Sequence, residues 1–273
     1  MIARSQKLVL PNGLTVHSLS RADTDVVYQE IFENDVYRRH GVTIADGDQI
    51  LDVGANIGML EVFLNHVGTS VAVHAFEPIP DIFEALRRNV ELHPNPNVQI
   101  HNCGISGKAG SATFAFYPRA SCMSSQFPND SPEEKARIVE YIYSQMDRFP
   151  TPQIARILRL FLGFSRTWVA ERIFHYVNHR VDVSCQLRTL SEIIAEYQLN
   201  RIDLLKVDAE RAELSIMQSL SVQDWSKIRQ AIVEVHDGFN VDPILEILRQ
   251  QGFRVTDDVN PLVPEVHLLY AVR

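Results

Sequence analysis

Several acidic side chains and one histidine stand at or just after the ends of apolar segments, and their types and spacing suit ligand binding and proton transfer. In an open α/β sheet, ligands bind outside the carboxyl ends of the strands, so we expect these side chains to face one crevice. A carboxylate there attracts an ammonium group or ribose hydroxyls, and an imidazole can accept a proton. The residues concerned are Asp52, Glu77, Asp208, Glu210, Glu234 and His236.

The segment 49–58 reads Gln-Ile-Leu-Asp-Val-Gly-Ala-Asn-Ile-Gly, an apolar strand that runs into a turn with Gly54 and Gly58. A strand, a glycine turn and a helix open a nucleotide-binding βαβ unit, where glycine allows the backbone to approach the ligand. The turn lacks the dinucleotide pattern Gly-x-Gly-x-x-Gly, and Asp52 would repel a pyrophosphate. The spacing instead resembles the S-adenosylmethionine loop of class I methyltransferases.

The next predicted strand, Val71–Phe76, is apolar apart from His74 and ends at Glu77-Pro78. A carboxylate at this position accepts hydrogen bonds from both ribose hydroxyls of a bound nucleoside. A lone acid after a strand more often begins a solvated loop, but Asp52 stands upstream at the interval expected of a nucleotide site. We therefore assign Glu77 and Pro78 to the cofactor site.

A short third strand is predicted at Val98–His101, and Asn102-Cys103 follow it directly. We expect this loop to run beside the adenine, which makes Asn102 and Cys103 candidate cofactor contacts. Asparagine also forms turns for purely local reasons, so a contact with adenine or ribose and a turn remain alternatives for Asn102.

The remaining pattern predicts an α/β fold with a mostly parallel sheet. Asn12-Gly13 marks a hairpin, residues 25–41 follow helical spacing, and two prolines stop a helix after Leu92. We expect one domain over 1–273, with an N-terminal hairpin and helix over 1–45. The expected elements are a hairpin at Lys7–Leu19, a helix at Asp81–Leu92, strands at Ile202–Val207 and Gln230–Val235, and a final antiparallel pair at Gly252–Val255 and Val266–Val272.

Residues 127–182 interrupt the alternation of strands and helices. Ser131-Pro132 supplies a cap and a first-turn proline, and two further stretches combine aromatic and aliphatic residues with arginines. We interpret the segment as a helical lid inserted in the domain. An oligomerisation or packing element with solvated arginines, and hence a homo-oligomer, is an equal alternative.

Length and composition limit the function classes. The 273 residues are 45% hydrophobic, enough for a sizeable core, and the net charge of −8 argues against a nucleic-acid backbone as the main partner. Three cysteines without a Cys-x-x-Cys pair indicate neither a disulfide framework nor a zinc knuckle, and a reducing cytoplasm fits best. The sequence has no apolar run long enough to span a membrane, so we expect no membrane partner.

Several motifs together resemble the FkbM-type methyltransferases: Asp-Val-Gly-Ala-Asn-Ile-Gly, Phe-Glu-Pro, Leu-Arg-Thr-Leu, Ile-Asp-Leu-Leu-Lys-Val-Asp-Ala-Glu and Val-Glu-Val-His, over roughly residues 36 to 272. The resemblance implies a Rossmann-like class I methyltransferase fold, a mostly parallel seven-stranded sheet with an antiparallel edge strand. It implies methyl transfer from S-adenosylmethionine, often to a hydroxyl of a polyketide, sugar or other secondary metabolite. The cofactor residues that it implies are Asp52, Gly54, Asn56, Gly58 and Glu77.

One departure from the family pattern concerns the strand end at Asp208. The family continues Asp-x-Glu-Gly, whereas this chain has Glu210-Arg211. Because glycine adopts backbone angles that arginine avoids, we expect the loop to shift. We still consider Glu210 a candidate substrate contact.

Methyl transfer requires an aligned acceptor and removal of its proton. His236 is the first candidate base because an ordinary imidazole is largely neutral near pH 7, and Asp208 or Glu234 would orient it. A strand-end histidine bonded to backbone is the alternative. The same three residues, Asp208, Glu234 and His236, could instead bind a divalent metal that acidifies a hydroxyl. Ser124 and Ser125 are candidate substrate contacts or simple turn formers.

A small-molecule O-methyltransferase explains both the glycine loop and the acidic strand ends. The alternatives are a cofactor-binding scaffold without catalysis, an N-methyltransferase, and a nicotinamide oxidoreductase, which the missing pyrophosphate fingerprint disfavours. The arginines of 127–182 suit an acceptor carried on an acidic acyl carrier protein.

Overall fold

A computed structural model describes residues 5–128, 174, 179–260, 262–263 and 266–273. Its centre is a seven-stranded sheet with the strand order β11-β12-β10-β9-β3-β4-β5. Only β12 runs antiparallel to its neighbours in this sheet. The strands are β3 (Gln49–Val53), β4 (Ala72–Phe76), β5 (Val98–His101), β9 (Leu204–Val207), β10 (Gln230–Val235), β11 (Arg254–Val259) and β12 (His267–Val272).

The sheet confirms the fold class predicted from the sequence and differs from the prediction in one detail. The antiparallel strand β12 lies between β10 and β11, so the edge strand is β11, which runs in the same direction as the parallel strands. β11 and β12 are antiparallel, as the final pair predicted from the sequence requires. Because β12 pairs on both sides, β11 takes the exposed edge and carries the charges Asp257 and Asp258 there.

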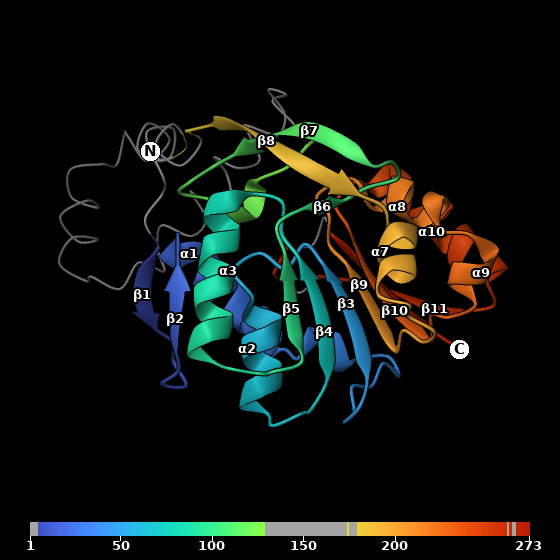
Figure 1. Cartoon of the computed structure of the whole chain (residues 1–273), viewed down its shortest axis with the longest axis horizontal. Helices are drawn as coiled ribbons and strands as arrows, with labels where there is room; N and C mark the ends of the chain where they lie inside the picture. Colours follow the sequence, from blue (N-terminus) through green and yellow to red (C-terminus); the bar gives the residue numbers. More distant parts are fainter. Residues whose placement is uncertain (1–4, 129–173, 175–178, 261, 264–265) are drawn as a thin grey trace, which may run out of the picture.

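Helices lie on both faces of the sheet (Figure 1). Alternating side chains of the strands enter two separate cores, one on each face. Ile50 of β3 packs with the N-terminal segment and the helices α1 (Arg21–Tyr28), α2 (Met59–His66) and α3 (Pro80–Leu92). Its neighbour Leu51 packs on the other face with helices α7 (Leu190–Glu196), α8 (Glu213–Ser219), α9 (Val222–Trp225) and α10 (Gly238–Gln250). The result is a three-layer α/β/α arrangement.

The N-terminal segment begins with the antiparallel pair β1 (Gln6–Val9) and β2 (Thr15–Ser18), at the place where the sequence predicts a hairpin. Ser20 caps α1, which continues into a π-helix, Gln29–Glu33, and a 3-10 turn, Val36–Arg38. One regular helix over 25–41 was expected, and these short pieces take its place. The buried Asn89 joins this segment to the glycine turn by donating to His17 O and Ile57 O.

A second sheet, of order β6-β8-β7, lies beside the carboxyl ends of the central strands (Figure 1). It contains β6 (Gly104–Ile105), β7 (Gly110–Phe116) and β8 (Val181–Arg188). The sequence did not predict β8, which pairs antiparallel with the distant β7. Most of the predicted lid, 129–173 and 175–178, lies outside the described residues. Its roles as a lid or as an oligomerisation element therefore stay predictions.

No helix within the described part of the chain combines the length and the apolar character needed to cross a membrane.

Candidate active site

The turn after β3 is held against both neighbouring strands. Gly54 and Ala55 donate their backbone N–H groups to Phe76 O of β4, each at 3.0 Å. Gly54 has φ +79°, and a Cβ added to it would lie 1.8 Å from the backbone oxygen of Asp208, at the end of β9. The glycine therefore makes room for another strand end of the same protein. Gly58, at φ +82°, begins α2.

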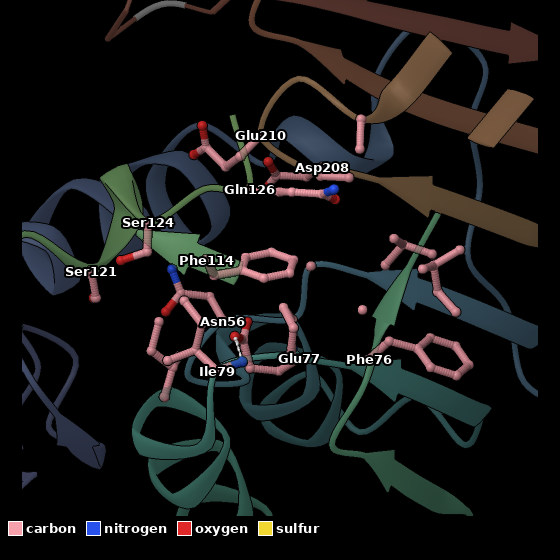
Figure 2. A pocket seen from close by; sticks show the side chains of 18 of the residues that line it. Asn56, Phe76, Glu77, Ile79, Phe114, Ser121, Ser124, Gln126, Asp208 and Glu210 are labelled. Atoms are coloured by element: carbon pink, nitrogen blue, oxygen red, sulfur yellow. Dashed lines mark hydrogen bonds between the residues drawn. The ribbon is translucent and has the colours of Figure 1, made fainter. Parts of the chain in front are cut away.

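Glu77 lies at the bottom of a cavity at the carboxyl ends of the strands, with Asn56 beside it (Figure 2). Its side chain is 5% exposed, and Oε1 accepts a hydrogen bond of 2.9 Å from Ile79 N–H. Burial raises the pKa of the Glu77 carboxyl to about 8, although the backbone N–H groups of Ile79 and Asn56 favour its ionised form. The apolar side of the cavity is formed by Val53, Phe76, Ile79, Ile82, Ile105 and Phe114.

The predicted cofactor residues divide into those that line this cavity and those that support it. Gly54, Asn56, Glu77 and Pro78 are lining residues. The others are Asp52, Gly58, Asn102 and Cys103, none of which belongs to the described lining.

Asn102 holds the loop that carries Glu77. Its Nδ2 donates to Glu77 O at 2.9 Å and to Pro78 O at 3.1 Å. Cys103 is buried, and the two residues after it, Gly104 and Ile105, reach the cavity instead. The turn-forming alternative thus describes the Asn102 contacts in this structure.

Asp52 is 1% exposed and pairs with a lysine that the sequence analysis did not consider. Lys206 Nζ lies 3.0 Å from Asp52 Oδ1 and 3.3 Å from Asp208 Oδ2, and it donates to Gly54 O at 2.8 Å. Burial lowers the pKa of Lys206, but the attraction of Asp52, Tyr37 and Asp208 outweighs this and raises the pKa well above its ordinary value. The lysine therefore joins the glycine turn to the end of β9.

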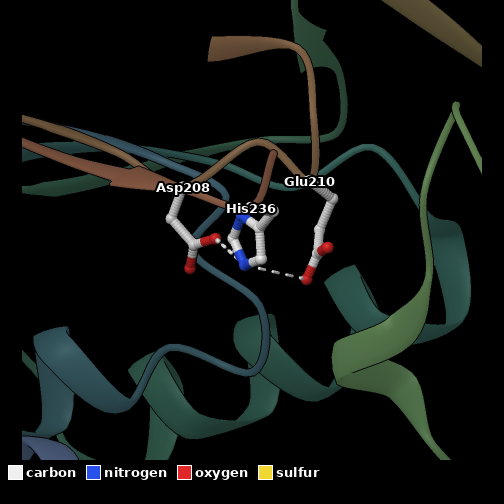
Figure 3. Close-up of side chains that lie close together, drawn as sticks. All are labelled: Asp208, Glu210 and His236. Carbon is white, nitrogen blue, oxygen red and sulfur yellow. Dashed lines mark ion pairs between the residues drawn. The ribbon is translucent and has the colours of Figure 1, made fainter. Parts of the chain in front are cut away.

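His236 stands at the carboxyl end of β10 among four carboxylates. Its Nε2 lies 3.6 Å from Glu210 Oε1 and 3.8 Å from Asp208 Oδ1 (Figure 3). It also lies 3.9 Å from Glu234 Oε1, so the structure brings the predicted catalytic residues together. The orienting partner is a residue that the sequence analysis missed. Nδ1 faces Glu213 Oε1 at 3.3 Å, at the start of α8.

The carboxylates alter the protonation that the sequence analysis assumed for His236. Burial lowers the pKa of the imidazole, but Glu210, the Glu213 hydrogen bond, Asp208 and Glu234 together raise it well above its ordinary value. The surrounding carboxylates therefore favour the protonated form of the imidazole. His236 must be neutral to accept a proton as a general base, and these carboxylates oppose that neutral form.

The loop after β9 keeps a glycine-like backbone without a glycine. Glu210 has φ 47° and Arg211 has φ 81°, both in the left-handed region. Glu213 Oε1 accepts from Ala209 N–H and Arg211 N–H, and Ser125 Oγ donates to Glu210 O at 2.7 Å. Arg211 thus adopts a left-handed backbone that glycine would favour, and Glu210 lines the cavity.

The two predicted substrate serines have different positions. Ser124 lines the cavity, and its Oγ accepts from Tyr117 N–H. Ser125 is buried and supports the loop of Glu210. Gln126, next in the chain, also lines the cavity, although the sequence contained no signal for it.

A further acidic residue comes from the N-terminal segment. Asn260 Nδ2 donates to Glu30 Oε1 at 2.7 Å and lies 3.4 Å from Glu234 Oε1. Burial and repulsion from Asp208 raise the pKa of Glu234 to about 8. Glu30 lies in the π-helix, a local widening that often occurs at functional sites.

The family model for the methyltransferase FkbM domain matches residues 52–255. The chain belongs to this family. It is 33% identical over 271 residues to the 31-O-demethyl-FK506 methyltransferase FkbM of Streptomyces tacrolimicus, covering 98% of this chain and 97% of that protein. It is 32% identical over 280 residues to the AMB antimetabolite synthetase AmbE of Pseudomonas aeruginosa, covering 97% of this chain but 12% of that protein.

Among solved structures, Aeropyrum pernix fibrillarin with natively bound S-adenosyl-L-methionine aligns with a TM-score of 0.44 and 11% identity, over 100% of this chain and 84% of that one. The FkbM-family membership and the strand order of the central sheet identify a methyltransferase of the Rossmann-like class I fold.

Proposed function

We propose that this FkbM-family protein transfers a methyl group from S-adenosylmethionine to a hydroxyl of a small secondary metabolite. The observation that carries the proposal is one shared cavity. Its lining includes Asn56 and Glu77 at one side and Asp208 and Glu210 at the other (Figure 2). The residues proposed to bind the cofactor and those proposed to act on the acceptor therefore line one cavity.

The residues at the first side fit an adenosyl cofactor. Glu77 is buried at the end of β4, where an ionised carboxylate would accept the ribose hydroxyls. The apolar side chains of Ile79, Ile105 and Phe114 would flank the adenine. When bound, S-adenosylmethionine supplies an electrophilic methyl group on a sulfonium.

The residues at the second side would position the acceptor and accept its proton. Asp208 and Glu210 follow the end of β9, and His236 follows the end of β10, so the sheet places their polar atoms close together without long flexible connections. Positioning of this kind converts an encounter between two molecules into a reaction within one complex. The largely apolar walls near Phe114 would exclude competing water.

The names of two relatives support the acceptor class. One relative is named as an O-demethyl-FK506 methyltransferase, which supports methylation at oxygen. The other is named as an antimetabolite synthetase, and this chain matches only 12% of it. The match of this chain to one segment of a synthetase supports an acceptor that is carried on an acyl carrier protein during assembly.

The first test is calorimetric titration of the protein with S-adenosylmethionine, S-adenosylhomocysteine and NADH. We expect only the adenosyl ligands to bind, and Glu77→Gln to weaken them at least ten-fold. The exposed Glu246, on α10, provides the matched control Glu246→Gln. Binding of NADH alone would overturn the proposal.

The second test follows methyl transfer from labelled S-adenosylmethionine to a panel of free and carrier-bound hydroxyl compounds. An O-methyl product identified by NMR supports the proposal. An N-methyl product would replace oxygen by nitrogen as the acceptor, and cofactor binding without turnover across the panel would favour a non-catalytic scaffold.

A further inference from the structure

Asp208, Glu210 and His236 each present one ligand atom, and these atoms all lie within 4.8 Å of one another (Figure 3). We propose that this cluster binds a divalent cation of the manganese class, which activates the acceptor hydroxyl; that role rests on the proposed methyl transfer. The set differs from the one predicted from the sequence, because Glu210 replaces Glu234.

The distances around His236 suit ligands of a common ion better than direct hydrogen bonds. Nε2 lies 3.6 Å from Glu210 Oε1 and 3.8 Å from Asp208 Oδ1, beyond ordinary hydrogen-bond length. Neighbouring ligand atoms that each bind an ion at about 2.0–2.2 Å lie roughly 2.8–3.6 Å apart in octahedral or tetrahedral geometry. A small contraction of the cluster would therefore close it on a cation.

The second ring nitrogen of His236 contacts a carboxylate, as in many metal sites. A histidine ligand usually donates its second ring N–H to a carboxylate, which fixes the ring orientation. Here Nδ1 faces Glu213 Oε1 at 3.3 Å, and Glu213 is 0% exposed. This contact leaves Nε2 directed at Asp208 and Glu210, which line the cavity.

The buried acidic groups around the cluster also favour binding of a cation. Glu213 Oε2 is buried without a hydrogen-bond partner among the described residues. Glu234 Oε1 lies 3.9 Å from Nε2, and Asn260 links Glu234 to Glu30, which adds acidic groups. Lys206 is committed to Asp52 and Gly54 as well as to Asp208. Buried charged groups are paired or coordinate metals, so a cation at this cluster would stabilise its carboxylates.

The ligand types select the class of ion. Two carboxylates and one imidazole suit manganese or ferrous iron better than magnesium, which prefers oxygen ligands and water. The open cavity side leaves coordination positions for water and the acceptor. The cation would lower the pKa of the acceptor hydroxyl, and the hydroxyl proton would pass to Glu234, whose Oε1 lies 3.9 Å from His236 Nε2. The acceptor oxygen would then form a bond to the methyl carbon while the carbon–sulfur bond breaks. The electron pair of the broken bond would remain on sulfur.

The test is a titration of chelator-treated protein with MnCl2, in which the electron paramagnetic resonance signal of free Mn²⁺ reports binding. We expect one tight site per chain. Asp208→Asn and Glu210→Gln should each weaken it at least ten-fold, and Glu246→Gln should not change it. Glu213→Gln should weaken Mn²⁺ binding about 10- to 100-fold, as loss of an outer carboxylate does elsewhere.

Thermal melting of each variant without metal shows whether it is folded, and Glu210→Gln is the decisive variant because its side chain is partly exposed. A wild-type protein that leaves the free Mn²⁺ signal unchanged would overturn the proposal, as would unaltered affinity in both Asp208→Asn and Glu210→Gln. S-adenosylhomocysteine is titrated separately in EDTA. Nucleoside binding without Mn²⁺ binding rejects the cation site alone, whereas Mn²⁺ binding without nucleoside binding rejects the proposed function alone.

Discussion

Replacement of Gly54 by alanine should damage both the fold and the cofactor site, because two separate constraints meet at this residue. Its backbone has φ +79°, which alanine adopts at a cost of about 1–2 kcal/mol. The new Cβ would also lie 1.8 Å from Asp208 O, where real contacts begin near 3.0 Å. Asp208 backbone must therefore retreat, and overpacking of this kind costs typically about 1–3 kcal/mol.

The chain offers a matched control that separates these two terms. Gly68 has nearly the same backbone angle, φ +76°, but nothing lies within 4 Å of its added Cβ. Gly68→Ala should thus show only the backbone cost. Gly54→Ala should lower the free energy of unfolding by about 2–5 kcal/mol, which corresponds to a fall in Tm of roughly 4–20 °C.

Differential scanning calorimetry of both variants measures this difference, and calorimetric titration with S-adenosylhomocysteine measures its effect on the site. We expect Gly54→Ala to lose binding and Gly68→Ala to keep it, because only the former displaces Asp208. Equal Tm values and equal affinities in the two variants would refute the reasoning.

Three further predictions concern the charges and the loop of the site. Burial raises the pKa of Glu77 from 4.5 to about 8. Between these pH values the folded protein holds a proton that the unfolded chain releases. The free energy of unfolding should therefore fall as pH rises through this range, by about 1.4 kcal/mol per pH unit. Denaturant titrations of wild type and Glu77→Gln should differ by this slope, and parallel pH profiles would contradict it. Lys206→Met leaves Asp52 and Asp208 without their shared cation, and urea unfolding should show a loss of about 3–5 kcal/mol, whereas a loss under 1 kcal/mol would mean that the pair is not buried as described. Arg211→Gly relieves a left-handed arginine, so Tm should stay level or rise by a few degrees; a large fall would show that the Arg211 hydrogen bond to Phe127 O outweighs the strain.

Local signals predicted the positions of the residues that we propose to hold the cofactor. A buried strand followed by a glycine turn has few alternative conformations, and the strand that ends at Glu77 follows by the same pattern. The position of Asn56 and Glu77 in one cavity agrees with this interpretation. Asn102 shows its limit, because its identity indicates a polar contact but not whether ligand or backbone receives it.

The acidic half was only partly visible. Side chains two residues apart on a strand point to the same face, which groups Glu234 with His236. In the structure, Glu234 Oε1 lies 3.9 Å from His236 Nε2. Glu213 was missed because an acid in the first turn of a helix is ordinarily explained by the helix dipole. Its contact with His236 depends on the packing of α8 against β10, which no local pattern encodes.

The sequence by itself determined the strand ends, the glycine turn and hence the chemistry available at the sheet edge, because strand period and backbone freedom are local properties. Tertiary structure alone decided the charge balance. It placed Lys206 between Asp52 and Asp208, and it surrounded His236 with carboxylates from β9, α8 and β10. Electrostatic energies depend on distance and burial, and both arise only when segments remote in the chain pack together.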